Sequence, residues 1–221
     1  MAASPEAATE GSVTVSGAPH YWFQATQELA QRDVVLGALI ERFPGLTLVG
    51  RGDAFSTLVR SIIGQQISVR AAQSVWERVA DRIRVISPAA VSRVRRSTLR
   101  KCGLSEQKAG YLKDLARRFL DGTIDVSRWP ELDDEALIAE LTRVRGIGRW
   151  TAEMFLMFHL MRPDVLPLAD LGLQRAMRIH YNRGRKLSSR RMQQIGRLWT
   201  PWRSVGTWYL WRSLDPIPVE Y

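Results

Sequence analysis

The chain has 221 residues, and its hydrophobic content of 45% is that of a folded protein able to bury one or two compact cores. Lysine and arginine outnumber aspartate and glutamate by 32 to 22, giving a formal net charge of +10, and a positive field of this size attracts polyanions such as nucleic acid. The single cysteine, Cys102, excludes an internal disulfide, a cysteine-ligated zinc site and a four-cysteine iron–sulfur cluster.

The first 18 residues are small, polar and acidic, and we interpret them as a flexible tail. They contain no basic segment followed by an apolar core, so a signal peptide is not expected. No apolar run approaches the ~20 residues that a membrane span needs. The sequence therefore predicts an intracellular protein, in the cytoplasm or nucleoid, with no membrane partner.

Helical spacing of apolar residues recurs along the rest of the chain. The helical segments that it predicts are 20–45, 53–83 with an interruption at 64–66, 87–105, 106–122, 133–148, 149–161, 170–181, 188–199 and 201–215. Alternating apolar and polar runs bounded by turn residues, which are typical of strands, are nearly absent. About ten helices joined by short turns predict an all-α protein.

The segment LTRVRGIGRWTAEMFLMF, residues 141–158, places two glycines between two helical patterns. Gly146 and Gly148 can adopt backbone angles that other residues avoid, so one helix can end and the next begin almost at once. Such a turn exposes backbone N–H groups beside the positive end of the second helix, which suits a phosphate. On the glycines alone, an ordinary turn between two helices is the simpler interpretation.

The hairpin segment is one of five blocks that resemble a known family in the same order. The blocks are SIIGQQISVRAA (61–72), GLSEQKAGYL (103–112), the hairpin, VLPLADLGLQRAM (165–177) and WTPWRSVGTWYLWR (199–212). Together they resemble the helix-hairpin-helix (HhH-GPD) DNA glycosylase superfamily, in its 3-methyladenine DNA glycosylase II (AlkA-like) branch. The resemblance spans roughly residues 20–212. It implies an enzyme of base excision repair whose partner is double-stranded DNA containing damaged bases.

The resemblance also implies a two-lobed all-α fold with an active-site cleft between the lobes. One helical lobe is expected to comprise residues 54–162 and to end in the helix-hairpin-helix. The other is expected to be discontinuous, comprising residues 19–53 and 163–221. Some bacterial relatives carry a β-rich N-terminal domain, for which this chain has no room, so we expect a more open site. We also expect a monomer.

Asp170 is the candidate catalytic residue. From its position ahead of LGLQRAM it is first of all an ordinary helix N-cap, and the resemblance implies that it is also the family's catalytic aspartate. Breaking an N-glycosidic bond develops positive charge on the sugar, which a fixed carboxylate in a water-poor site stabilises. Asp170 can also position the attacking water, and the sequence leaves the balance between the two roles open.

The residue at position 150 distinguishes two kinds of glycosylase. Relatives with strand-cleaving lyase activity carry a lysine there, which forms a Schiff base with the sugar, whereas this chain has Trp150. The resemblance therefore implies a monofunctional glycosylase that leaves an abasic site. It also implies a base pocket formed by Trp150, Met154 and Trp211, in which Met154 stands where some relatives have a tyrosine. Aromatic walls attract the cationic rings of 3-methyladenine and 7-methylguanine.

Three further roles follow from the resemblance. Gln66 is expected to be the wedge that fills the duplex when the target base is extruded, although on its own it would be interpreted as a solvated glutamine. Gln65 is expected to be structural, at the break in the helix. Residues of the hairpin turn are expected to bind DNA phosphate: Gly146, Gly148, Arg149 and Thr151.

No organic cofactor, metal site or iron–sulfur cluster is expected, while a monovalent cation between hairpin carbonyls and a DNA phosphate is a weaker family feature. One alternative is a non-catalytic helix-hairpin-helix protein that only binds duplex DNA. Such a protein would need neither Asp170 nor Gln66 and Trp211. Another is a glycosylase for oxidised or mismatched bases, against which the absence of a lysine at position 150 counts.

Overall fold

The computed structural model describes residues 17–50 and 52–214. Within these residues all regular secondary structure is helical, with twelve α-helices, one 3-10 helix and no strand, which confirms the all-α class. None of the described helices is long and apolar enough to cross a membrane. Most of the predicted tail, residues 1–18, lies outside the described part of the chain.

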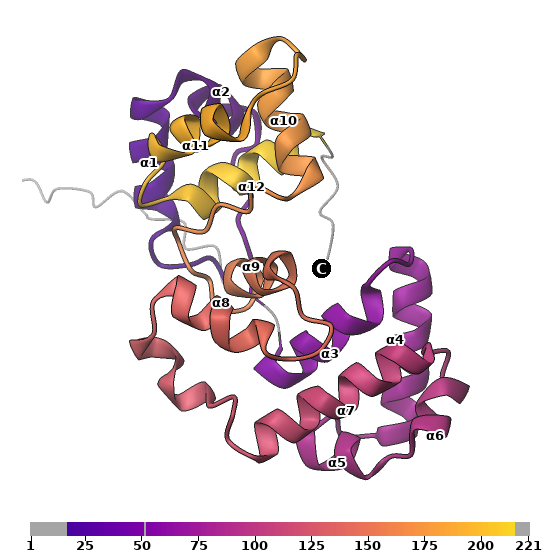
Figure 1. Cartoon of the computed structure of the whole chain (residues 1–221). Coiled ribbons are helices and arrows are strands. Elements are labelled where there is room, and N and C mark those ends of the chain that lie inside the picture. The colour runs from indigo at the N-terminus through magenta and orange to yellow at the C-terminus, as the bar shows by residue number, and fades with distance from the viewer. Residues whose placement is uncertain (1–16, 51, 215–221) are drawn as a thin grey trace, which may run out of the picture.

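The connections between successive helices range from one residue, between α1 and α2, to twelve residues, between α9 and α10 (Figure 1). In chain order they are α1 (Trp22–Arg32), α2 (Val34–Arg42), α3 (Ala54–Gly64), α4 (Val69–Ile83), α5 (Pro88–Arg93), α6 (Arg96–Lys101), α7 (Glu106–Leu120), the 3-10 helix η1 (Val126–Glu131), α8 (Asp134–Thr142), α9 (Arg149–Phe158), α10 (Leu171–Asn182), α11 (Ser189–Arg197) and α12 (Arg203–Leu214).

Side-chain caps fix several helix starts that the sequence predicts. Asp53 accepts a hydrogen bond from a first-turn N–H of α3, Ser87 does the same for α5, and Pro88 follows Ser87 at the first helical position. The predicted interruption at 64–66 separates α3 from α4. The 3-10 helix η1 was not predicted. The segment 87–105, predicted as one helical segment, forms two separate helices of six residues each.

Asp33 divides the N-terminal segment, which the sequence analysis wrongly treats as one continuous helical pattern. Its backbone leaves the helical region (φ −140°, ψ 108°), and one carboxylate oxygen accepts two N–H groups of the first turn of α2 at 2.9 and 3.1 Å. The other oxygen accepts hydrogen bonds from the Tyr181 hydroxyl (2.8 Å) and the Trp199 indole (3.0 Å). Asp33 is buried, and these bonds tie α2 to the C-terminal helices.

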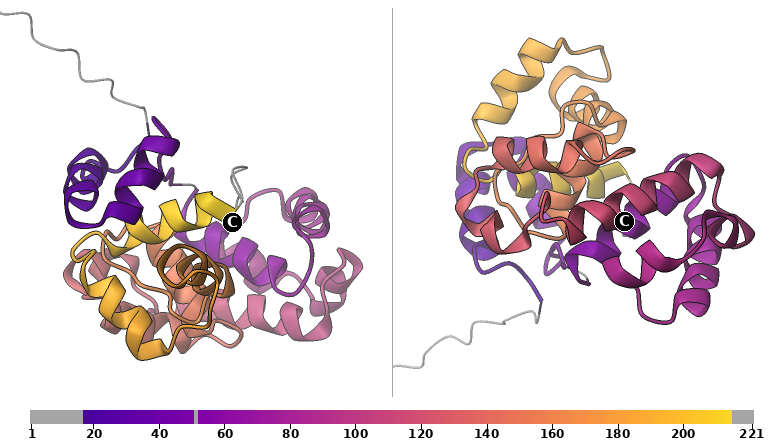
Figure 2. Two further views of the ribbon diagram at one scale, coloured as in Figure 1. Left: turned by 90° about the horizontal axis from the view of Figure 1, so that it is seen from above. Right: turned by 60° about the horizontal axis from the view of Figure 1, so that its bottom comes forward.

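Buried apolar side chains form two clusters. The first draws its buried members from residues 54–165, and the second from residues 21–48 and 173–210. Figure 2 shows α3–α7 gathered on one side of the molecule and α1, α2 and α10–α12 on the other. Phe158 on α9 packs against both clusters. The exact lobe boundaries stay a prediction.

The connection from α9 to α10 is held against the start of α12. The Ser204 hydroxyl donates to the Arg162 carbonyl oxygen (2.6 Å) and accepts from the Val165 N–H (3.0 Å). Arg203 forms a two-pronged ion pair with Asp164, with N–O distances of 2.6 and 2.9 Å. Because this connection is anchored, the residue that begins α10 has a defined place relative to α9 and α12.

Candidate active site

Asp170 lies at the N-cap of α10 and is 8% exposed. Its Oδ1 accepts hydrogen bonds from the Leu173 backbone N–H (2.6 Å) and from the Trp211 indole N–H (2.8 Å). Its Oδ2 accepts from the Trp150 indole N–H (2.9 Å). The N-cap expected from the sequence is therefore present. Donors from α9, α10 and α12 together fix the orientation of the carboxylate.

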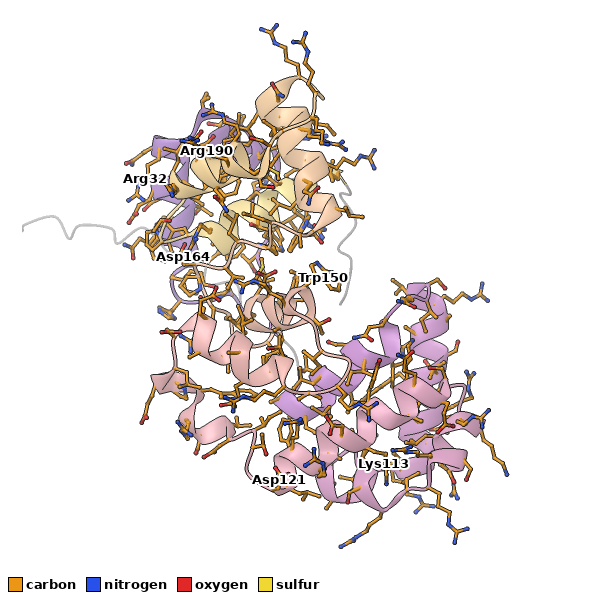
Figure 3. The ribbon with its side chains drawn as sticks, in the orientation of Figure 1. Arg32, Lys113, Asp121, Trp150, Asp164 and Arg190 are labelled. Carbon is orange, nitrogen blue, oxygen red and sulfur yellow. The ribbon has the colours of Figure 1, made fainter. Side chains whose placement is uncertain are left out.

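Trp150 and Trp211 do more than the sequence predicts of them. They were expected to be aromatic walls, which stays a prediction, and the structure shows in addition that both indole N–H groups donate to the Asp170 carboxylate. The Trp211 ring stacks on Phe158, with 5.8 Å between centroids and 14° between planes. Trp150, which Figure 3 labels, remains 37% exposed, and its indole N–H contacts the carboxylate, so an accessible aromatic residue lies beside Asp170. That residue suits the recognition of a cationic base.

Met154 lies one turn after Trp150 on α9 and is 6% exposed. Its side chain belongs to the first apolar cluster. In this conformation it offers little surface to a base, so its part in the pocket stays a prediction. The flexible thioether is suited to rearranging if a base enters beside Trp150.

The two glycines of the hairpin between α8 and α9 serve different purposes. Gly146 has φ +88°, and a Cβ there would come within 2.1 Å of Tyr111 Cδ2, so conformation and packing both require glycine. Gly148 has φ −90° and ψ 172°, which any residue adopts, and a Cβ there would meet nothing within 4 Å. The expectation of an unusual backbone is therefore correct for Gly146 and wrong for Gly148. What Gly148 provides instead is a position in the turn that carries no side chain.

The N-terminus of α9 has the character of an anion site. Gly148 is its N-cap, and no side chain caps the first-turn N–H groups. Thr151 is 7% exposed, so its part in binding phosphate stays a prediction. The Asp114 carboxylate accepts the Arg145 N–H (2.9 Å) and so anchors the turn to α7.

Arg149, predicted to bind phosphate, is held by two acidic residues. Its Nη1 donates to Glu135 on α8 and its Nε to Glu153 on α9, each at 2.9 Å. These contacts, Glu135 first, raise the pKa of Arg149. Glu153 is 4% exposed, and burial raises its pKa. Arg149 would have to leave these partners to reach DNA, so its phosphate role stays a prediction.

A cavity of about 450 Å³ lies beside this arginine. Its wall is mostly charged and comprises Asp133, Asp134, Glu135, Ile138, Arg149, Glu153, Arg162, Asp164, Val165, Leu166 and Arg203. Asp170 and the tryptophans that hold it are not part of this wall. We place the candidate chemistry at Asp170, because the carboxylate and the exposed ring lie together there and the arginines of the cavity are occupied by acidic partners.

Gln66, the predicted wedge, is exposed and lies in the turn between α3 and α4 with φ +58°. The neighbouring Gln65 donates its side-chain N–H to the Gly146 carbonyl oxygen at 2.7 Å, which links this turn to the hairpin. Lys108 donates to the carbonyl oxygens of Ile63 (2.8 Å) and Gln65 (2.6 Å) at the end of α3. Gln65 is thus structural as expected, whereas Lys108 was not identified from the sequence.

The hairpin carbonyls are compatible with a monovalent cation. The Gly146 oxygen accepts from Gln65 (2.7 Å) and the Val144 oxygen from the Ile147 N–H (3.1 Å), so each keeps a second lone pair. The cation stays a prediction. In the described part of the chain, no three His, Cys, Asp or Glu side chains are grouped to hold a metal ion.

The structure thus combines the α8–α9 hairpin with a buried aspartate, Asp170, which accepts a hydrogen bond from the tryptophan 20 residues before it. The family model described as "HhH-GPD superfamily base excision DNA repair protein" matches residues 59–201. The match covers more than half of the chain, so this chain belongs to the HhH-GPD superfamily.

Relatives and solved structures agree with this assignment. The DNA-3-methyladenine glycosylase 1 of Schizosaccharomyces pombe is 30% identical over 165 residues, covering 73% of this chain and 72% of that one. The crystal structure of a DNA-3-methyladenine glycosidase from Bacillus halodurans is 32% identical, with a TM-score of 0.81, and the match covers 86% of this chain and 89% of that one.

A second solved structure is that of an S. pombe 3-methyladenine DNA glycosylase in complex with abasic DNA. It is 25% identical with a TM-score of 0.73, and the match covers 89% of this chain and all of that one. The matches to three curated relatives cover 66%, 72% and 70% of the lengths of those relatives.

Proposed function

We propose that this protein is a monofunctional DNA glycosylase that excises alkylated purines of the 3-methyladenine and 7-methylguanine type from duplex DNA inside the cell, acting as a monomer. It hydrolyses the N-glycosidic bond of an extruded base and leaves an abasic site. The observation that carries the proposal is the Asp170 carboxylate, held at the start of α10 by two indole N–H groups. The names of the relatives support the substrate class.

The carboxylate acts on the sugar. As the base leaves, the C1′–N bond breaks and positive charge develops on the deoxyribose ring, which a fixed negative group stabilises. Water then bonds to C1′ and loses its proton, for which Asp170 is a candidate acceptor. Water is the second substrate, so the reaction needs no organic cofactor.

The residue at position 150 and the contacts of two lysines support hydrolysis rather than lyase chemistry. Position 150 holds a tryptophan, and the nearest basic group to it in sequence, Arg149, is paired with acids. Lys108 donates to backbone carbonyl oxygens at the end of α3, and Lys113 donates to those of Val91 and Val94 at the end of α5. Neither ammonium group is therefore placed to attack C1′ at Asp170.

The exposed Trp150 ring supports cationic bases as substrates. A methylated purine such as 7-methylguanine carries positive charge, and an aromatic face attracts a cation by about 0.5–2 kcal/mol. Its bond to the sugar is already labile, so a pocket with modest shape selectivity can still discriminate.

The test is release of 3-methyladenine and of 7-methylguanine from duplex DNA, comparing wild type with Asp170→Asn under single-turnover conditions. Asparagine is as good an N-cap as aspartate, so the variant should fold. Losing the charge should reduce the release rate by about 100- to 1000-fold. Binding to a duplex with an abasic-site analogue should change by only a few fold.

Two outcomes would contradict the proposal. If wild type releases no alkylated base although it binds duplex DNA, the protein belongs to the non-catalytic DNA-binding class. If borohydride traps a covalent protein–DNA adduct during base release, the enzyme forms a Schiff base and is not monofunctional.

A further inference from the structure

The positive charge of this protein is concentrated in one segment. Residues 171–214 contain nine arginines, one lysine and no aspartate or glutamate. This excess of ten positive charges equals the formal net charge of the whole chain, +10. The remainder of the sequence is therefore electrically balanced, and the field that attracts polyanions originates in α10, α11, α12 and their connections.

Most of these basic side chains are free to bind an external anion. Arg203 pairs with Asp164, and Arg212 lies over the Trp208 ring at 5.2 Å. The other eight are exposed and form no ion pair with a described residue: Arg175, Arg178, Arg183, Arg185, Lys186, Arg190, Arg191 and Arg197. By contrast, Arg117, Arg118 and Arg149 elsewhere in the molecule are each paired with a carboxylate.

A row of exposed positions on α10 leads away from the catalytic carboxylate. Leu171 directly follows Asp170 and is 79% exposed, and Arg175 and Arg178 are exposed at intervals of four and three residues. This spacing places them on one face of the helix. The opposite face, with Leu173 among its buried residues, packs into the second apolar cluster.

The turn after α10 continues this row with a defined backbone. Arg183 and Gly184 adopt positive φ angles of 51° and 80°. The Asn182 side chain donates to the carbonyl oxygens of Arg185 (3.2 Å) and Lys186 (3.0 Å). The turn thus presents three cationic side chains at the far end of α10, where Figure 3 shows nitrogen-tipped side chains extending outward.

We propose that Arg175, Arg178, Arg183, Arg185 and Lys186, here called the basic stripe, bind the phosphates of the duplex on one side of the target base. The proposal rests on the glycosylase function and extends the DNA contact beyond the hairpin. At 1.5 Å per residue, α10 carries the stripe about 17 Å from Asp170. At 3.4 Å per base pair, this distance corresponds to phosphates about five base pairs from the target.

The test compares two variants of the full chain with equal loss of charge. The stripe variant carries Arg178→Gln, Arg185→Gln and Lys186→Gln. The control carries Arg82→Gln, Arg93→Gln and Arg95→Gln, which are exposed residues between α4 and α6, outside α10–α12. Affinity is measured by fluorescence anisotropy across a salt series, using a duplex of about 25 base pairs with a central abasic-site analogue, a span well beyond five base pairs on each side.

The stripe variant should lose about 2.7 units of the slope of log K against log salt concentration, at about 0.9 for each of three contacts. The ratio of wild-type to variant affinity should therefore fall about 40-fold between 50 and 200 mM salt. The control variant should lose a clearly smaller part of this slope. Two further duplexes carry the analogue about three base pairs from one end or the other, closer than the proposed contact. One of these two duplexes lacks the DNA on the side of the target base that the basic stripe contacts. Wild type should bind that duplex as weakly as the stripe variant does.

Equal losses in the stripe and control variants would overturn the proposal, because they would reflect general charge alone. Equal losses of affinity on both end-shifted duplexes would also overturn it, because the phosphate contact would then not be confined to one side of the target base. Failure of the glycosylase function is distinguishable, since it would appear as absent base release while these binding differences persist.

Discussion

The contact between Trp211 and Asp170 yields a quantitative prediction. Trp211→Phe keeps an aromatic ring stacked near Phe158 but removes the N–H that donates to Asp170 Oδ1 at 2.8 Å. A hydrogen bond to a charged group contributes about 1.5–3 kcal/mol. If this energy maintains the catalytic orientation, the single-turnover rate of base release should fall about 10- to 100-fold, at 1.36 kcal/mol per tenfold.

The matched control is Trp208→Phe on the same helix. Trp208 is 7% exposed and packs edge-to-face on Trp22, with 5.2 Å between centroids, and no hydrogen bond connects it to Asp170. Its replacement should cost stability, by about 1–2 kcal/mol for the lost ring volume, without changing the release rate of folded protein. Thermal unfolding and release rates are measured for both variants. The reasoning fails if Trp211→Phe keeps the wild-type rate, or if Trp208→Phe slows release equally.

Two other predictions concern the hairpin and its buried glutamate. Gly146→Ala should lower the free energy of unfolding by about 2–4 kcal/mol in urea titrations, since φ +88° and the Tyr111 ring both exclude a Cβ. Gly148→Ala should leave stability almost unchanged but weaken duplex binding, and equal stability losses would contradict this. Burial raises the pKa of Glu153 above 4.5, so wild-type stability should fall as pH rises from 4.5 through that raised pKa. Glu153→Gln should abolish this dependence, and parallel stability curves for the two proteins would refute it.

Local chemistry explains why much of the fold follows from the sequence. The N-caps Asp53, Ser87 and Asp170 act within three residues of themselves, and apolar periodicity over a dozen residues separates helices from strands. The same local reasoning fails at Asp33. Its cap interrupts an otherwise continuous apolar pattern, and its second oxygen bonds to residues far along the chain.

The candidate site depends on contacts between residues far apart in the chain, which the local spacing of residue types does not predict. Trp211 and Asp170 are 41 residues apart, and Lys108 is 45 residues from the Ile63 carbonyl that it binds. The sequence marks Trp211 and Asp170 as important only through resemblance to a family, and it gives no sign that the indole nitrogens are the contacting atoms. The pairing of Arg149 with Glu135 is similarly hidden, because it joins two helices across the hairpin.

The N-cap role that the structure shows for Asp170 and the catalytic role that we propose for it depend on each other. An ionised carboxylate has about four lone-pair sites, of which Leu173, Trp211 and Trp150 occupy three. The fourth is left for a sugar or a water molecule, next to the exposed ring of Trp150. Because the cap and the indoles already orient the group, no reorganisation is needed when charge develops. A glutamate at position 170 would carry its oxygens one methylene further and lose the Leu173 contact, so the short aspartate serves both roles.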